Sequence, residues 1–495
     1  NTTDISEHAL RSVYLPPFKA ALDAGAATVM SAFNDLNGVP ASGNAYTLTG
    51  ILRREWGWDG LVVSDYTSVA ELVNHGLAAD GPDAARLSLS AGVDMEMVSR
   101  LYNQHGTELL KDGRLSQAAV EEAVRRVLRA KFRAGAFERP YAAEGREEAV
   151  NLSPAHRALA REAAVKSMVL LKNDGVLPLS KDLKSLAVVG PWADSKAELL
   201  GSWTGDGRAE DVTSVTAALR DALPSQTRFV AAPEADFVVV VLGEDATMSG
   251  EASSRSELGL PPGQLELVEA VKASGKPFAV VLLTGRPLAI PRLVEISPAV
   301  LLAWQPGTEG GRAVADVLLG RENPGGKLPA TFPRSVGQIP LYYNHKNTGR
   351  PYDPASKYTS KYLDLPNTPL FPFGHGLSYT SFELSGLGLS AAEVPPGGKA
   401  VVMVSVMNTG ARTGDEVVQV YLRAPAGPVT RPVRELKGFK RVRLGPGESR
   451  RLEFPLGPEE LGFPGPEGTK VSPGTYQVYV GTSSAAGLKL EFLQR

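Results

Sequence analysis

The sequence predicts an α/β protein that ends in an all-β sandwich. Up to about residue 335, short apolar runs alternate with amphipathic segments of helical spacing, which is the pattern of parallel strands joined by helices. From about residue 381, strand-like runs are separated by short turns that contain Gly and Pro, as in β-sandwiches. The chain has 495 residues, whereas a single core stops growing at about 250–300 residues, so several domains are expected.

Composition excludes several classes of function. The net charge is −2 and no segment is rich in Lys and Arg, so we expect neither a nucleic-acid nor a membrane partner. The absence of cysteine excludes disulfides, thiolate metal sites and a Cys nucleophile. No apolar stretch approaches the roughly 18 residues of a membrane-spanning helix. His, Asp and Glu show no metal-ligand spacing, so neither a metal nor another cofactor is expected.

Residues 1–135 carry the first strand–helix pattern. Helices are predicted over 48–56 and 115–132, and three apolar runs read as buried strands, at 27–33, 60–65 and 92–97. A closed β/α barrel needs eight strands and about 250 residues, and this region offers roughly three clear strands. The pattern therefore fits either a small open sheet or the back part of a barrel.

The rest of the chain divides by composition. Residues 136–150 are polar and read as a linker, and residues 151–335 are predicted to form a second α/β domain with strands at 186–190, 237–242, 278–283 and 300–304. Residues 336–380 are rich in Gly, Pro and Tyr and read as an extended connector. Residues 381–495 form the predicted sandwich, with strands at 400–406, 416–422, 450–454 and 474–480.

Two acidic residues follow predicted strands in positions that could carry chemistry. Asp65 ends the second apolar run, where barrel and open-sheet enzymes keep catalytic groups, although capping of the following helix explains its position equally well. Glu251 lies in a long polar loop, 243–255, which could be functional or merely solvated. Asp94 and Glu96, at the end of the third run, could serve as nucleophile, as binding groups or as hydrogen-bonding groups at the sheet edge.

A pair of carboxylates is what glycoside hydrolysis requires. One attacks the anomeric carbon, and the other protonates the leaving oxygen and later activates water. In retaining enzymes the two groups lie about 5–5.5 Å apart. Two acids on different domains could form such a pair if the domains pack together, which spacing in the sequence does not decide.

Several segments resemble family 3 glycoside hydrolases. Residues 57–66 resemble the nucleophile strand of this family, and residues 250–255 resemble the acid/base loop of its three-domain bacterial β-glucosidases. Further similar segments are 29–40, 167–173, 371–379 and 435–439, the last in a fibronectin-III-like domain. The resemblance covers essentially the whole chain, in order.

This resemblance implies a partial (β/α)8 barrel, an α/β sandwich domain that carries the acid/base loop, and a fibronectin-III-like β-sandwich. It implies that Asp65 is the nucleophile and Glu251 the acid/base, with Tyr66, Met30 and Phe33 beside the sugar ring. Many relatives have Trp at the position of Tyr66 and Tyr at the position of Phe33. Tyr66 keeps an aromatic face for stacking, whereas Phe33 cannot make the hydroxyl hydrogen bond.

The resemblance also implies an activity, a partner for the exposed barrel surface and a cellular location. The expected function is that of a retaining, exo-acting β-glucosidase acting on β-linked glucosides or short oligosaccharides. A β-xylosidase or α-L-arabinofuranosidase of the same family is one alternative, and a non-catalytic carbohydrate-binding fragment is another. The barrel of this family begins before the position of Asn1, so a preceding segment that holds sugar hydroxyls is expected to be missing. The exposed barrel surface would then pair with that segment or with a second copy, and a periplasmic or secreted location is expected.

Overall fold

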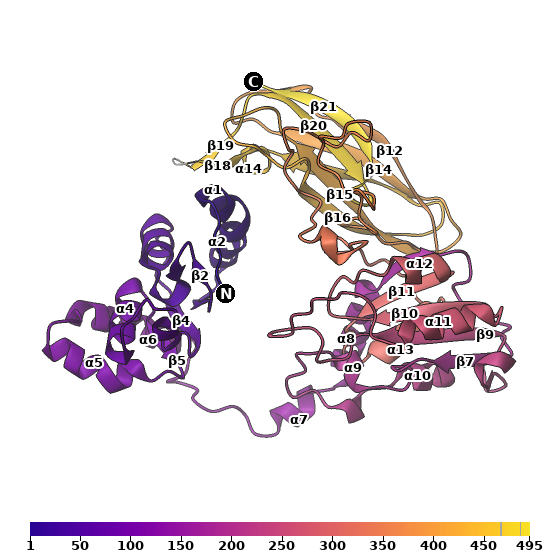
Figure 1. The fold of residues 1–495 in the computed structure, drawn as a ribbon, viewed down its shortest axis with the longest axis horizontal. Helices are drawn as coiled ribbons and strands as arrows, with labels where there is room; N and C mark the ends of the chain where they lie inside the picture. Colours follow the sequence, from indigo (N-terminus) through magenta and orange to yellow (C-terminus); the bar gives the residue numbers. More distant parts are fainter. Residues whose placement is uncertain (466–467, 486) are drawn as a thin grey trace. The chain divides into compact units, whose positions relative to one another are not determined.

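The computed structural model describes residues 1–465, 468–485 and 487–495. By their internal contacts these residues form two compact units, residues 1–147 with 463–469 and residues 148–462 with 470–495 (Figure 1). None of the helices in the described part of the chain has the length and apolar character needed to cross a lipid bilayer.

The first unit is built on a three-stranded parallel sheet with the order β1–β4–β5. These strands are the three predicted from the sequence, and they span Thr28–Ser31, Leu61–Tyr66 and Met95–Met97. A short hairpin, β2 (Asp35–Leu36) and β3 (Val39–Pro40), follows β1. The helices are α1 (Glu7–Ala9), η1 (Leu10–Tyr14), α2 (Leu15–Asp23), η2 (Ala41–Gly43), η3 (Tyr46–Glu55), α3 (Glu71–Asn74), α4 (Gly81–Ala91), α5 (Leu101–Lys111) and α6 (Gln117–Arg133).

The two faces of this sheet differ in burial. On one face Val62 is fully buried in a cluster with Leu48 and Leu52 of η3. On the other face Val63 pairs with both Met30 and Met95, whose side chains are 48% and 47% exposed. Because side chains alternate along a strand, Asp65 shares the face of Val63. We call this surface the open face, defined by Met30, Val63, Asp65 and Met95.

The second unit begins with an α/β domain around a six-stranded sheet of order β6–β11–β10–β9–β7–β8. The four predicted strands are β7 (Ser185–Val189), β9 (Phe237–Gly243), β10 (Phe278–Leu283) and β11 (Ala299–Trp304). The sheet has two further strands, β6 (Val169–Asn173) and β8 (Arg228–Phe229), and β6 runs antiparallel to β11. A short helix, α7 (Arg146–Val150), lies within the segment predicted to be a linker.

Helices cover both faces of this sheet, as Figure 1 shows. One face packs against α8 (Pro154–Ser167), α9 (Ala197–Leu200), α10 (Val215–Ala222) and α13 (Gly310–Leu318). The other packs against α11 (Gln264–Ala273) and α12 (Pro291–Ile296). All seven residues of β9 are buried, which is why this strand reads as one continuous apolar run.

The C-terminal part of the second unit is a β-sandwich, as predicted. One sheet has the order β12–β14–β17 and the other β13–β21–β20–β15–β16. Alternate residues of β14, beginning with Ala400, point into the core between the sheets. The strands span Phe382–Leu389 (β12), Glu393–Val394 (β13), Ala400–Asn408 (β14), Gly414–Arg423 (β15), Glu435–Leu444 (β16), Ser449–Leu456 (β17), Gly474–Gly481 (β20) and Leu488–Gln494 (β21). The described fold thus has the predicted class, α/β followed by a β-sandwich.

Candidate active site

Asp65 is the penultimate residue of β4 and stands half-buried on the open face. Its Oδ1 accepts a hydrogen bond from the backbone N–H of Tyr66 at 2.7 Å, and the residues that the structure describes place no donor on Oδ2. Helix α3 has no side-chain cap, so Asp65 does not cap the helix that follows it. One oxygen of this carboxylate is therefore fixed and the other is available to a ligand.

The backbone around Asp65 rests on a chain of buried hydroxyl groups. Ser42 Oγ lies 2.8 Å from Ser31 Oγ and 2.7 Å from Ser68 Oγ, and all three residues are almost fully buried. Ser31 ends β1 and Ser68 lies in the turn after β4, where Thr67 adopts a left-handed φ of 61°. Buried hydrogen bonds of this kind fix the carboxyl ends of β1 and β4 relative to each other.

The other residues predicted for the sugar site lie close in the same unit. Met30 is on the open face, one strand away from Asp65. Tyr66 ends β4 and is 58% exposed. Phe33 is half-buried just after β1, and its carbonyl oxygen lies 3.1 Å from Nε2 of His75. The structure thus brings Asp65, Tyr66 and Met30 to the carboxyl end of the sheet, with Phe33 directly beyond β1.

Asp94 and Glu96 have structural partners instead. The buried Asp94 carboxylate accepts hydrogen bonds from Arg53, from Arg126 and from a backbone amide of β4. Glu96 accepts a 2.6 Å hydrogen bond from the backbone N–H of Tyr102 at the start of α5, and burial raises the pKa of Glu96. The geometry therefore favours hydrogen bonding at the sheet edge for Asp94, whereas Glu96 makes such a bond through Oε1 and its buried Oε2 has no hydrogen-bond partner among the described residues.

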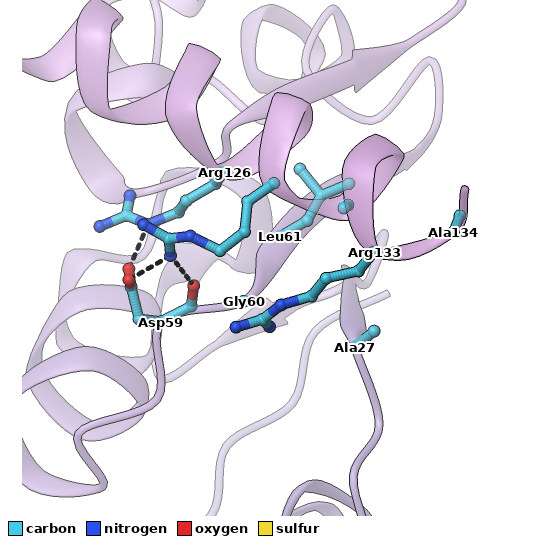
Figure 2. A pocket seen from close by; sticks show the side chains of 9 residues that line it. Ala27, Asp59, Gly60, Leu61, Arg126, Arg133 and Ala134 are labelled. Carbon is cyan, nitrogen blue, oxygen red and sulfur yellow. Dashed lines mark hydrogen bonds and ion pairs between the residues drawn. The ribbon is translucent and has the colours of Figure 1, made fainter. Parts of the chain in front are cut away.

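A hollow of about 230 Å³ lies at the opposite end of β4 from Asp65 (Figure 2). Asp59, Gly60 and three arginines of α6 line it, and Arg126 Nε lies 2.9 Å from Asp59 Oδ1. Arg129 also pairs with Asp59. Residues at this amino-terminal end of parallel strands usually serve stability, and the ion pairs fit that role.

Glu251 belongs to the second unit, in the loop between β9 and α11. Its side chain is exposed, and no partner for its carboxylate is found among the described residues. The flanking residues Gly250 and Ala252 both have left-handed backbone, with φ of 101° and 57°. A non-glycine residue in this region carries strain, which is common at functional loops.

Trp203 is a neighbour of this loop that sequence reasoning missed. It is 75% exposed, and a Cβ added to Gly250 would lie 3.6 Å from Trp203 Nε1 and 2.8 Å from Ser202 Oγ. The indole therefore lies beside the segment that carries Glu251. In the sequence this segment is a Gly-containing loop without the features of a phosphate loop, and its Trp was the one available signal. The exposure of the indole is known only from the structure.

Comparison with known families covers most of the chain. The model "Glycosyl hydrolase family 3 N terminal domain" matches residues 1–130, "Glycosyl hydrolase family 3 C-terminal domain" matches 168–379, and "Fibronectin type III-like domain" matches 416–484. The chain belongs to glycosyl hydrolase family 3. The predictions of the family, of a glycoside hydrolase and of a fibronectin-III-like domain are thus confirmed.

Relatives of the chain are named for two of the expected activities, β-glucosidase and β-xylosidase. The chain is 42% identical to the periplasmic β-glucosidase of Salmonella typhimurium, over 98% of this chain and 70% of that protein. It is 40% identical to a β-xylosidase of Formosa agariphila, over 98% of this chain and 71% of that protein. The crystal structure of a β-glucosidase from Listeria innocua in complex with glucose superposes with a TM-score of 0.96 at 40% identity, covering 100% of this chain and 71% of that one.

Proposed function

We propose that this family 3 chain removes terminal β-D-glucose from β-glucosides with retention of anomeric configuration. Asp65 attacks the anomeric carbon and forms a covalent glycosyl-enzyme. Glu251 gives its proton to the departing oxygen and then removes a proton from the water that releases glucose. The observation that carries this proposal is the Asp65 carboxylate, which stands at the carboxyl end of a parallel strand with only Oδ1 hydrogen-bonded among the described residues.

The sugar contacts follow from the side chains around Asp65. Tyr66 offers an exposed aromatic face on which a sugar C–H surface can stack. Met30 supplies an apolar surface on the open face, and Phe33 supplies apolar contact without a hydroxyl group. We assign these three residues to the terminal sugar.

Trp203 belongs to the leaving-group side in this proposal. An acid that protonates the leaving oxygen must lie within hydrogen-bond reach of the bond being cleaved. The exposed indole beside the Glu251 segment then faces the group attached to that oxygen. An aromatic surface there favours a second sugar or an aryl group as the leaving group.

The alternative substrate is a β-xyloside, supported by the β-xylosidase relative. Xylose lacks the hydroxymethyl group of glucose, and rejection of a missing group by an apolar pocket is weak, about 1–3 kcal/mol. The β-glucosidase names of the Salmonella and Listeria relatives favour glucose. A non-catalytic sugar-binding role would be favoured by binding without turnover.

The open face also suggests a partner. Met30 and Met95 expose about half of their side chains there. Apolar surface of this kind is usually covered in a stable protein. We propose that further barrel strands or a second copy cover the part of this face that substrate does not, and that sedimentation measurements distinguish the two.

The proposed function is tested by assaying the chain on nitrophenyl β-glucoside and β-xyloside, with Asp65→Asn and Glu251→Gln variants as controls. Each substitution keeps the size of the side chain and removes its charge. We expect faster turnover of the glucoside and a loss of at least about 10²-fold in each variant. Full activity in either variant would overturn the assignment of that residue.

A further inference from the structure

A buried ion-pair cluster lies beneath the loop that carries Glu251. Glu244, the first residue after β9, has a side chain that is 1% exposed. Its Oε1 lies 2.7 Å from Nη1 of Arg255 and 3.2 Å from Nε of Arg286. Its Oε2 accepts a 2.7 Å hydrogen bond from the hydroxyl of Thr284. This carboxylate thus accepts a hydrogen bond from Arg255 and forms an ion pair, without a hydrogen bond, with Arg286.

Arg286 reaches from this cluster to the backbone of the loop. Its Nη2 donates to the carbonyl oxygen of Ser253 at 2.7 Å and also to the carbonyl oxygen of Met248. These two carbonyl groups lie on either side of Glu251 in the sequence. A single guanidinium group therefore holds both ends of the segment 248–253.

The segment has a further attachment on its buried side. Gln305 donates to the hydroxyl of the buried Ser249 at 3.0 Å. A Cβ at Gly285 would lie 2.1 Å from the same hydroxyl oxygen, so Ser249 packs directly on glycine backbone. The chain bends at Gly250, which has a left-handed backbone, and Glu251 is exposed whereas Ser249, two residues before it, is buried.

We propose that Arg286 is a positioning residue for the acid/base, and that Glu244 holds Arg286 in place. The inference rests on the proposed role of Glu251. Proton transfer requires the carboxyl group to lie within hydrogen-bond reach of the leaving oxygen. A displacement of about 1 Å in such a group can lower the rate by about 10²-fold. The clamp across 248–253 is what limits that displacement.

The competing explanation is that the cluster only stabilises the fold. The two explanations differ in how the rate depends on the leaving group. A poor leaving group, such as an alkyl alcohol, needs the proton from the general acid, whereas dinitrophenolate leaves without it. Misplacement of Glu251 therefore slows glycosyl transfer from alkyl glucosides much more than from dinitrophenyl glucosides, while a general loss of folded protein lowers both rates equally.

The test compares four variants with the unchanged chain on methyl and dinitrophenyl β-glucosides, using pre-steady-state rates for the first step. Arg286→Met removes the clamp, and Arg286→Lys keeps the buried charge if the first variant does not fold. Arg292→Met is the matched control, because Arg292 pairs with Glu269 and Glu295 away from the loop. Glu251→Gln is the reference for loss of the acid. Amide exchange of the peptide that contains Glu251 is measured in parallel.

We expect Arg286→Met to lower the rate on the methyl glucoside by about 10²-fold and to change the dinitrophenyl rate several-fold less. Arg286→Lys should show the same selectivity at a smaller magnitude, and Arg292→Met should show none. If Arg286→Met lowers the rates on both substrates equally while Glu251→Gln slows mainly the methyl glucoside, the positioning role of Arg286 is overturned and the role of Glu251 stands. A Glu251→Gln variant without selectivity would overturn the proposed function itself. If the unchanged chain does not turn over, faster amide exchange in both Arg286 variants supports the clamp, and unchanged exchange contradicts it.

Discussion

Arg53 and Asp94 form an ion pair inside the first unit, with Nη2 of the arginine 2.8 Å from Oδ2 of the aspartate. Their side chains are 11% and 2% exposed. The other oxygen of Asp94 lies 2.9 Å from Nη1 of Arg126, and the backbone N–H of Val62 donates to Oδ2. Asp94 therefore links η3, α6 and the strand that carries Asp65.

Removal of this charge should destabilise the first unit. Asp94→Asn leaves two guanidinium groups facing one neutral amide in a buried place, so we expect the free energy of unfolding to fall by about 3–5 kcal/mol. Urea unfolding followed by circular dichroism measures this change. Asp59→Asn is the control, because Asp59 pairs with the same Arg126 at the surface, and its cost should stay below about 1 kcal/mol. Equal effects of the two substitutions would contradict the role of Asp94.

His375 should make the second unit sensitive to acid. Burial lowers the pKa of His375 below its ordinary value of 6.5, and Nε2 lies 3.0 Å from the carbonyl oxygen of Leu171, to which the neutral ring donates. The stability from this neutral ring is complete above pH 6.5 and is lost as the pH falls through the lowered pKa. We expect the Tm of the unchanged chain to fall with acidification more steeply than that of His375→Gln. The exposed His156→Gln should keep the steep dependence, and equal slopes in all three proteins would contradict the prediction.

Trp203 should matter in proportion to the size of the leaving group. Loss of an aromatic contact costs about 0.5–1.5 kcal/mol, so Trp203→Ala is expected to lower kcat/KM for a glucose disaccharide by up to about ten-fold. The effect on methyl β-glucoside should be smaller, because a methyl group is too small to stack on the indole. Tyr358→Ala, at another exposed aromatic residue of the second unit, is the control. An unchanged ratio of the two substrates would place Trp203 outside the substrate site.

An external nucleophile should restore the second step of the reaction when the Glu251 carboxylate is removed. Glu251→Ala cannot activate water, so on dinitrophenyl β-glucoside the glycosyl-enzyme should accumulate and turnover should become slow. Azide needs no general base, so its addition should restore turnover and give β-glucosyl azide. Chromatography of the products checks this outcome. Rescue that yields the α-azide, or no rescue in a folded variant, would be inconsistent with the assigned role.

The sequence predicted the parts of the fold that are set by apolar periodicity. β9 was predicted because every position along it is apolar and buried. β6 was not predicted as a strand, because it lies at the sheet edge and pairs antiparallel, which no local pattern indicates. Asp65 could be proposed as a catalytic residue because it ends an apolar run, 60–65, that is recognisable in the sequence as a strand.

The support around Glu251 could not be predicted in the same way. The hydrogen bond between the Arg286 side chain and the Ser253 carbonyl group joins residues 33 positions apart. Such a contact produces no periodic pattern of residue types in the sequence. Glu244 reads as one more acid in a polar loop, and only the structure shows that it is buried between two arginines. Trp203 is brought beside Gly250 by the fold of the second unit.

The central claim, that Asp65 forms the covalent intermediate, is tested most directly by trapping that intermediate. In a dinitrophenyl β-glucoside with fluorine in place of the hydroxyl group next to the anomeric carbon, fluorine destabilises both oxocarbenium-like transition states. The good leaving group keeps the first step accessible, so the glycosyl-enzyme forms and is released slowly. Digestion and tandem mass spectrometry then locate the label. We expect one fluoroglucosyl group on Asp65 and none in Asp65→Asn. A label on another carboxylate, such as Glu96, or full turnover without any trapped species, would contradict it.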